Sequence, residues 1–197
     1  MKYQPFFEVV EKPLYFGTLP GWQSEPLIAL VGEAVRRNRS IEHTAYVLAT
    51  AHHETGRFKF THELGKGSGR DYGQKLLIMR GQYVRYYGRS YVQLTWLANY
   101  ARMSIRLSMD LGREIDLVNN PDLAVMPEIA SAIIWEGMIG GMFTGKNLAD
   151  YVNGDRVDYV KARKIVNGND KAKKIAGYAE QFETALRALN IMKGVAA

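Results

Sequence analysis

The sequence has no cysteine, which excludes a disulfide framework and a thiol nucleophile and is typical of proteins made in a reducing compartment. It also lacks any apolar run near the roughly 18 residues of a membrane-spanning helix. Residues 1–20 do not show the basic-then-apolar order of a secretion signal. From these absences we expect synthesis in a reducing cytoplasm.

The overall composition is that of an ordinary globular protein, with 47% apolar and 23% charged residues in a chain of 197 that fits one domain. The net charge of +6 favours polyanionic partners such as nucleic acid, anionic lipid or bacterial cell wall. A basic surface also serves plain solubility, so the charge alone does not choose among these alternatives.

Apolar residues recur at three- and four-residue spacing along much of the chain, which predicts helices with one buried face. The expected helices cover residues 24–39, 40–54, 127–143, 155–166 and 175–189, and residues 90–100 are expected to lead into a helix that reaches Leu107. Shorter helical starts are expected at 119–123 and 147–150. The helix from Pro127 is nearly all apolar and is expected to be central. Residues 83–88 are aromatic and β-prone, which indicates a short strand or hairpin. The sequence therefore predicts a mainly α fold with at most a small β-hairpin.

Residues 1–23 are harder to interpret, because their apolar residues are irregularly spaced and three prolines interrupt any long helix. We expect an extended N-terminal arm over residues 1–23 that packs on a single domain formed by residues 24–197. No repeat or linker divides that domain in the sequence.

The stretch from Thr50 to Glu63 contains two carboxylates on either side of a helix-breaking glycine, Gly56. Glu54 closes the helix that Ser40 is expected to cap, so the negative end of the helix dipole and apolar neighbours both disfavour its charge. That setting suits a general acid, whereas Glu63 lies in an irregular, wetter segment and is expected to be ionised. Two carboxylates in such opposed environments are typical of glycosidic bond hydrolysis.

Other interpretations of this region are weaker. His52, His53 and the carboxylates invite a metal site, but adjacent helical residues point about 100° apart and no HExxH pair occurs. We therefore expect neither a metal nor a cofactor. The glycine-rich residues 65–73 lack the order of a phosphate-binding loop, so we expect a flexible flap beside the site. Asp71 in this flap is a rival to Glu63 as the base.

Four stretches, in this order along the chain, resemble glycoside hydrolase family 19, which contains chitinases and related phage endolysins. They are residues 51–56 with Glu63, residues 86–96 with Asn99 and Tyr100, residues 119–123 followed by the helix that carries Ala132 and Trp135, and residues 163–168. The second, Tyr-Tyr-Gly-Arg-Ser-Tyr-Val-Gln-Leu-Thr-Trp, is the most specific. The resemblance spans residues 51–168.

The resemblance implies a lysozyme-like helical fold with two lobes and a cleft, and inverting hydrolysis of a β-1,4-linked amino sugar polymer. Glu54 matches the general acid of the family, and Glu63 matches the general base of its short-loop members. Gln93, Thr95 and Asn99 match residues that hold the sugar or the nucleophilic water, and we group Thr95 with the catalytic carboxylates. Short neutral side chains suit this task because they bring no competing charge.

Three further residues are assigned to substrate binding, each with a structural alternative. Asn167 matches a substrate-binding asparagine of the family, or simply caps a helix. Arg89 binds substrate, or ties a turn to a nearby carboxylate. Tyr87 and the other aromatic residues between 83 and 96 offer flat faces for sugar rings, or belong to the core.

The chain departs from the family at Ser90 and Asn169, where glycine is usual. Ser90 either tightens the turn or narrows a subsite. Neither departure touches the proposed acid or base.

Chitin and peptidoglycan share a β-1,4 N-acetyl sugar backbone, so these residues do not separate the two substrates. A small basic chain with no cysteine, signal peptide or chitin-binding module favours an endolysin that cleaves bacterial peptidoglycan between N-acetylmuramic acid and N-acetylglucosamine. The alternatives are a chitinase, a lytic transglycosylase, and a non-catalytic wall-binding or virion structural protein.

We expect a monomer with no nucleic-acid partner, made in the host bacterial cytoplasm and released to the periplasm and cell wall when a separate protein opens the membrane. A weak contact of the terminal helix with anionic outer-membrane or wall polymers is a further expectation, carried by Lys171, Lys173, Lys174 and Lys193. The alternative is ordinary docking of that helix on the domain.

Overall fold

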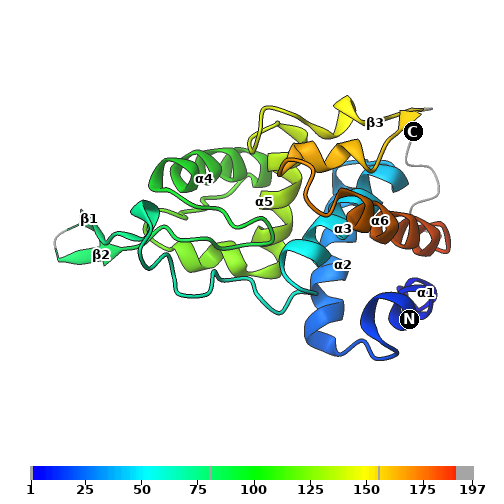
Figure 1. Ribbon diagram of the computed structural model, residues 1–197. Helices are drawn as coiled ribbons and strands as arrows, with labels where there is room; N and C mark the ends of the chain where they lie inside the picture. The colour runs from blue at the N-terminus through cyan, green and yellow to red at the C-terminus, as the bar shows by residue number, and fades with distance from the viewer. Residues whose placement is uncertain (1, 80, 155, 190–197) are drawn as a thin grey trace.

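The computed structural model describes residues 2–79, 81–154 and 156–189, and within them the chain is mainly helical (Figure 1). The described residues form six α-helices: α1 (Gln4–Tyr15), α2 (Gly21–Arg36), α3 (Ile41–Glu54), α4 (Leu97–Leu111), α5 (Pro127–Ile139) and α6 (Ala172–Arg187). In the same ranges there are four 3₁₀ helices: η1 (Asp71–Gly73), η2 (Pro121–Val125), η3 (Leu148–Asp150) and η4 (Lys161–Ile165). The prediction of a mainly α fold is confirmed.

The described strands form two short antiparallel hairpins, β1 (Leu76–Met79) with β2 (Gln82–Val84), and β3 (Val152–Asn153) with β4 (Arg156–Val157). The first lies close to the expected hairpin but begins earlier in the chain. The second stands where a helix was expected over residues 155–166, and that expectation is wrong. Gly154 adopts a positive φ of 46°, which suits a tight hairpin turn and interrupts a helix. Residue 155 lies outside the described residues, and helical structure resumes only in η4.

The N-terminal segment is a helix, α1, so the expectation of an extended arm is wrong. Pro5 stands in the first turn, where no intrahelical N–H bond is needed, and Pro13 falls in the last turn. Phe6, Val10 and Leu14 share one buried face, which packs against α6. The prolines therefore sit near the two ends of a helix instead of preventing one.

The observed helix starts agree with the predicted ones for α3 but not for α2. Helix α3 begins and ends where predicted: the hydroxyl of Ser40 accepts a hydrogen bond from the backbone N–H of His43, and the last helical residue is Glu54. Helix α2 begins at Gly21, one turn before the expected start. Helix α4 begins at Leu97, within the segment 90–100 that was expected to lead into it, and extends beyond Leu107 to Leu111.

The core consists of two hydrophobic clusters that share α5. Ile134 and Trp135 belong to the larger cluster, which also takes in α1, α2, α3 and α6, whereas Ala132 and Ile133 belong to the smaller cluster with α4 and η2. Figure 1 shows α5 between α4 on one side and α2 and α3 on the other. A helix buried on both sides must be apolar nearly all round, and the prediction of a central α5 is confirmed. Among the described helices, none is both long and apolar enough to cross a membrane.

Candidate functional site

Three of the predicted site residues, Gln93, Thr95 and Asn99, line one cavity of about 280 Å³. The side-chain amide of Asn99 donates a hydrogen bond to the backbone carbonyl of Thr95 at 3.0 Å, which fixes the first turn of α4 against the preceding segment. The polar residues of the most specific sequence motif are thus brought together around one space.

The walls of this cavity come from both hydrophobic clusters. Leu94 and Met103 belong to the smaller cluster, whereas Phe143 and Val166 pack against the larger one. Val92 also lines the cavity and packs against both. The cavity therefore lies where the two clusters meet, and junctions of this kind are common ligand sites. We call the smaller cluster with α4 the smaller lobe, and the larger cluster with α1, α2, α3 and α6 the larger lobe.

The backbone that carries the polar residues is strained. Ser90, Gln93 and Trp96 have φ angles of 74°, 55° and 70°, in the region that favours glycine. The segment is held there by paired hydrogen bonds between Arg89 and Leu94, at 3.1 and 2.7 Å. This irregular turn ends where α4 begins, and strained backbone of this kind concentrates at functional sites.

Glu63 lies beside the strained turn, with both carboxylate oxygens engaged. Oε1 accepts a hydrogen bond from the Tyr72 hydroxyl at 2.7 Å, and Oε2 accepts one from the Gly88 N–H at 3.0 Å. A Cβ at residue 88 would collide with Oε1 of Gln93 and crowd the Cβ of Glu63, so glycine allows these two side chains to approach. The bond to Glu63 raises the pKa of Tyr72, which keeps its hydroxyl a donor at neutral pH.

Glu54 ends α3 and pairs with Arg163 of η4, whose Nη1 donates a hydrogen bond to Oε1. Arg163 is buried, and its Nε donates to the backbone carbonyl of Asp170 at 3.0 Å. The Glu54 side chain keeps 22% of its surface exposed. The expectation of purely apolar neighbours is therefore wrong, because the carboxylate faces a buried cation. The two side chains form a charge-assisted hydrogen bond that ties η4 to the end of α3.

Neither carboxylate is among the described residues that line the Gln93 cavity. Glu63 adjoins it through Gly88, over which the Gln93 side chain lies. Glu54 is hydrogen-bonded to Arg163 of η4, and Val166, which follows η4, lies in the cavity wall. Tyr72 was not among the predicted site residues, and no role was predicted for Arg163, although Arg163 stands in the fourth motif.

Arg89 and Tyr87 lie beneath the site instead of facing open space. The buried Arg89 donates to Oδ1 of Asp122 at 2.7 Å and to the hydroxyl of Tyr100 at 3.1 Å, and its guanidinium lies 3.7 Å from the centroid of the Tyr87 ring. Tyr87 is buried as well, and its hydroxyl lies 3.3 Å from Nδ1 of His62. Both residues have little exposed surface for the substrate contact predicted for them, and Arg89 matches the alternative of a turn tied to a carboxylate.

The aromatic residues of the motif over residues 86–96 differ in how much of their surface is exposed. Tyr86 and Tyr91 are buried core residues, whereas Trp96 is 49% exposed. The Trp96 ring meets the Tyr72 ring edge-on at 5.7 Å, and both line an apolar pocket of about 520 Å³. Trp96 is therefore the motif's open platform, next to the tyrosine that holds Glu63.

Asn167 stays a candidate both for substrate binding and for helix capping, and Asp71 stays a rival of Glu63 as the base. Asn167 is exposed, and its Oδ1 accepts a hydrogen bond from the N–H of Gly168 at 2.8 Å. Asp71 is exposed beside Tyr72, in a loop folded back on itself so closely that a side chain on Gly73 would collide with the backbone of Gly67.

His52, two residues before Glu54, is a packed core residue. His52 is buried against the rings of Tyr15 and Tyr178, and burial, helped by the charge of Arg57, lowers its pKa to about 3. No group of three His, Asp or Glu side chains in the described ranges is arranged to hold a metal ion.

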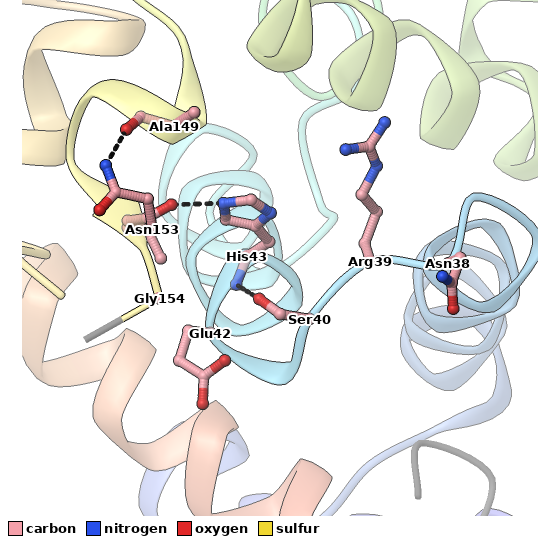
Figure 2. A pocket seen from close by; sticks show the side chains of 9 residues that line it. Asn38, Arg39, Ser40, Glu42, His43, Ala149, Asn153 and Gly154 are labelled. Atoms are coloured by element: carbon pink, nitrogen blue, oxygen red, sulfur yellow. Dashed lines mark hydrogen bonds between the residues drawn. The ribbon is translucent and has the colours of Figure 1, made fainter. Parts of the chain in front are cut away.

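A separate cavity of about 300 Å³ lies at the start of α3 (Figure 2). His43 and Asn153 are among its lining residues, and Nε2 of His43 donates to the carbonyl of Val152 at 2.6 Å. Burial lowers the pKa of His43, so its ring is neutral at pH 7. The predicted catalytic and substrate residues do not line this cavity.

Comparison of the chain with protein-family models and with curated proteins gives no match.

Proposed function

We propose that this protein is an endolysin that hydrolyses the β-1,4 bond between N-acetylmuramic acid and N-acetylglucosamine in bacterial peptidoglycan, with inversion. The observation that carries the proposal is the cavity between the lobes. It is lined by Gln93, Thr95 and Asn99, Glu63 lies close to Gln93 across Gly88, and Glu54 is hydrogen-bonded to Arg163, three residues before Val166 of the cavity wall.

In this mechanism Glu54 protonates the leaving oxygen, and the guanidinium of Arg163 stabilises the carboxylate that remains. Glu63 takes a proton from water on the opposite face of the sugar, with its two oxygens oriented by Tyr72 and Gly88. Thr95 and Gln93 orient that water and the sugar. Inversion requires the two carboxyl groups to stand about 6.5–9.5 Å apart, so that water fits between them.

The decisive variant is Glu54→Gln, which removes the proton but keeps the size of the side chain. Hydrolysis of purified peptidoglycan sacculi is expected to fall by about 10²-fold or more, because general acid catalysis is lost. The matched control is Glu25→Gln, the same change at an exposed position of α2. Undiminished hydrolysis by folded Glu54→Gln protein would refute the assignment.

The same assay identifies the base. Glu63→Gln is expected to lose a similar factor, whereas Asp71→Asn is expected to keep activity. The reverse result would assign the base to Asp71.

Reducing ends of inverted configuration are expected among the products, whereas 1,6-anhydro ends would indicate a lytic transglycosylase. Cleavage of chitin oligomers with intact sacculi would indicate a chitinase.

A further inference from the structure

The hairpin formed by β1 and β2 presents an apolar face to solvent. Leu77 and Tyr83 lie opposite each other in the strand register and are 59% and 61% exposed, and Met79 is 57% exposed. On the other face, Ile78 and Val84 pack against the smaller hydrophobic cluster. A two-stranded antiparallel sheet with one face on the core normally turns polar residues to water. Here the strongly exposed side chains are apolar: Leu77 pairs with Tyr83, and Met79 lies opposite Gln82 after an irregularity in the strand register. We call Leu77, Met79 and Tyr83 together the outer face.

The charged residues within the hairpin segment are all of one sign. Residues 75–85 contain Lys75, Arg80 and Arg85 and no acidic residue. The described part of the hairpin lies at one end of the molecule, away from α1 and α6 (Figure 1). It can therefore meet a flat surface without interference from the larger lobe.

This combination fits an anionic lipid surface better than the other candidate occupants. Leucine and methionine enter the acyl boundary, tyrosine suits the headgroup level, and the exposed cation of Lys75 meets lipid phosphates. A glycan would call for flat aromatic faces, and this outer face has one aromatic ring among aliphatic side chains. A second copy of the hairpin would bring like charges together.

We propose that the outer face of Leu77, Met79 and Tyr83 docks on an anionic phospholipid bilayer. The proposal stands apart from the catalytic one, because these three residues do not line the Gln93 cavity. It also places the lipid contact on the hairpin instead of the terminal helix.

The first experiment measures co-sedimentation of the full-length protein with vesicles of phosphatidylglycerol and phosphatidylcholine, and with vesicles of phosphatidylcholine alone. The double variant Leu77→Ser, Met79→Ser is expected to lose about tenfold or more in partitioning to the anionic vesicles, because two large apolar side chains lose their burial. The matched control is Ile105→Ser, Met109→Ser, a pair on α4 that is 63% and 80% exposed and is expected to bind like wild type.

A triple variant of α6, Lys171→Gln, Lys173→Gln and Lys174→Gln, tests the other surface and is expected to lose less than the hairpin variant. The proposal is overturned if the hairpin variant binds anionic vesicles like wild type, if the α4 control loses as much, or if the α6 variant loses more. Equal binding of wild type to vesicles of phosphatidylcholine alone would also overturn it, since the cations would then contribute nothing.

Because the chain has no cysteine, a single Leu77→Cys variant can carry a polarity-sensitive fluorophore. Its emission is expected to shift to the blue with anionic vesicles, whereas Met109→Cys is expected to show no shift. Hydrolysis of lipid-free sacculi by the Leu77→Ser, Met79→Ser variant is expected to equal wild type. A fall in that activity would mean that the outer face contacts the glycan, and would contradict the lipid assignment.

Discussion

Tyr72 connects two parts of the candidate site, because its hydroxyl donates to Glu63 and its ring meets the edge of Trp96. Tyr72→Phe would leave Glu63 with the Gly88 N–H as its orienting donor. We expect kcat on a soluble glycan to fall about tenfold with KM little changed, since the base loses its orientation but keeps its charge.

The control for Tyr72→Phe is Tyr83→Phe, which removes an exposed tyrosine hydroxyl of the hairpin. It is expected to leave kcat and KM unchanged. If Tyr72→Phe raises KM while kcat stays constant, Tyr72 acts as a binding platform for sugar and does not position Glu63.

Ser90, in the turn that also contains Gln93 and Trp96, has a strained backbone. It is fully buried with a φ of 74°, and its hydroxyl has no hydrogen-bond partner among the described residues. The left-handed conformation costs an L-residue about 1–2 kcal/mol, whereas glycine adopts it freely. The greater unfolded-state entropy of glycine opposes this gain by about 0.4–1 kcal/mol.

We therefore expect Ser90→Gly to raise the free energy of unfolding by about 1 kcal/mol, because relief of strain adds to removal of an unsatisfied buried hydroxyl. Urea unfolding of the two proteins measures the difference. A loss of stability would show that the hydroxyl makes a favourable contact, and would count against strain at this turn.

At the scale of elements, His52 stands where α3 meets α1 and α6. Burial lowers its pKa to about 3, whereas a histidine in the unfolded chain has a pKa near 6.5. Between about pH 6.5 and pH 3 the unfolded state binds a proton that the folded state does not, so stability falls as the pH falls through this window. The loss from His52 at pH 5 relative to pH 7 is expected to be about 2 kcal/mol.

The measurement is the free energy of unfolding of wild type and His52→Phe at a series of pH values. The variant is expected to show a flatter dependence between pH 7 and pH 5. The other histidines are present in both proteins, so the difference between the two curves isolates His52. Parallel curves would mean that His52 titrates normally in the folded protein.

The elements that were predicted correctly are those defined by local signals. Ser40 and Gly56 delimit α3 from sequence alone, and the apolar run from Pro127 indicates α5. Helix α1 was missed because a proline reads as a breaker unless its place within the helix is already known. The β3–β4 hairpin was missed because the helical pattern beyond Gly154 outweighed a short turn signal.

The candidate site also has a part that local sequence signals predict and a part that they do not. Gln93, Thr95 and Asn99 come from one contiguous motif, and their shared cavity could be anticipated. The pairing of Glu54 with Arg163 spans 109 residues, and nothing in the local pattern identifies that partner. Contacts of this kind depend on how η4 packs against the end of α3.

At the scale of the whole molecule, α5 is the structural link between the lobes. Neighbouring residues of this helix face different clusters: Ile133 lies in the smaller one and Ile134 in the larger, and both are fully buried. Because one helix contributes to both cores, we expect the lobes to unfold together as a single cooperative unit.

Ile133→Ala and Ile134→Ala form a matched pair that tests this coupling. Each substitution is expected to lower the free energy of unfolding by about 2–5 kcal/mol, and each variant is expected to keep one transition that coincides in tryptophan fluorescence and circular dichroism. Two separate transitions in Ile133→Ala alone would mean that the smaller lobe opens independently. The cavity wall formed by Leu94 and Met103 would then be lost while the larger lobe stayed folded, and hydrolysis would fail at a lower denaturant concentration than the main transition.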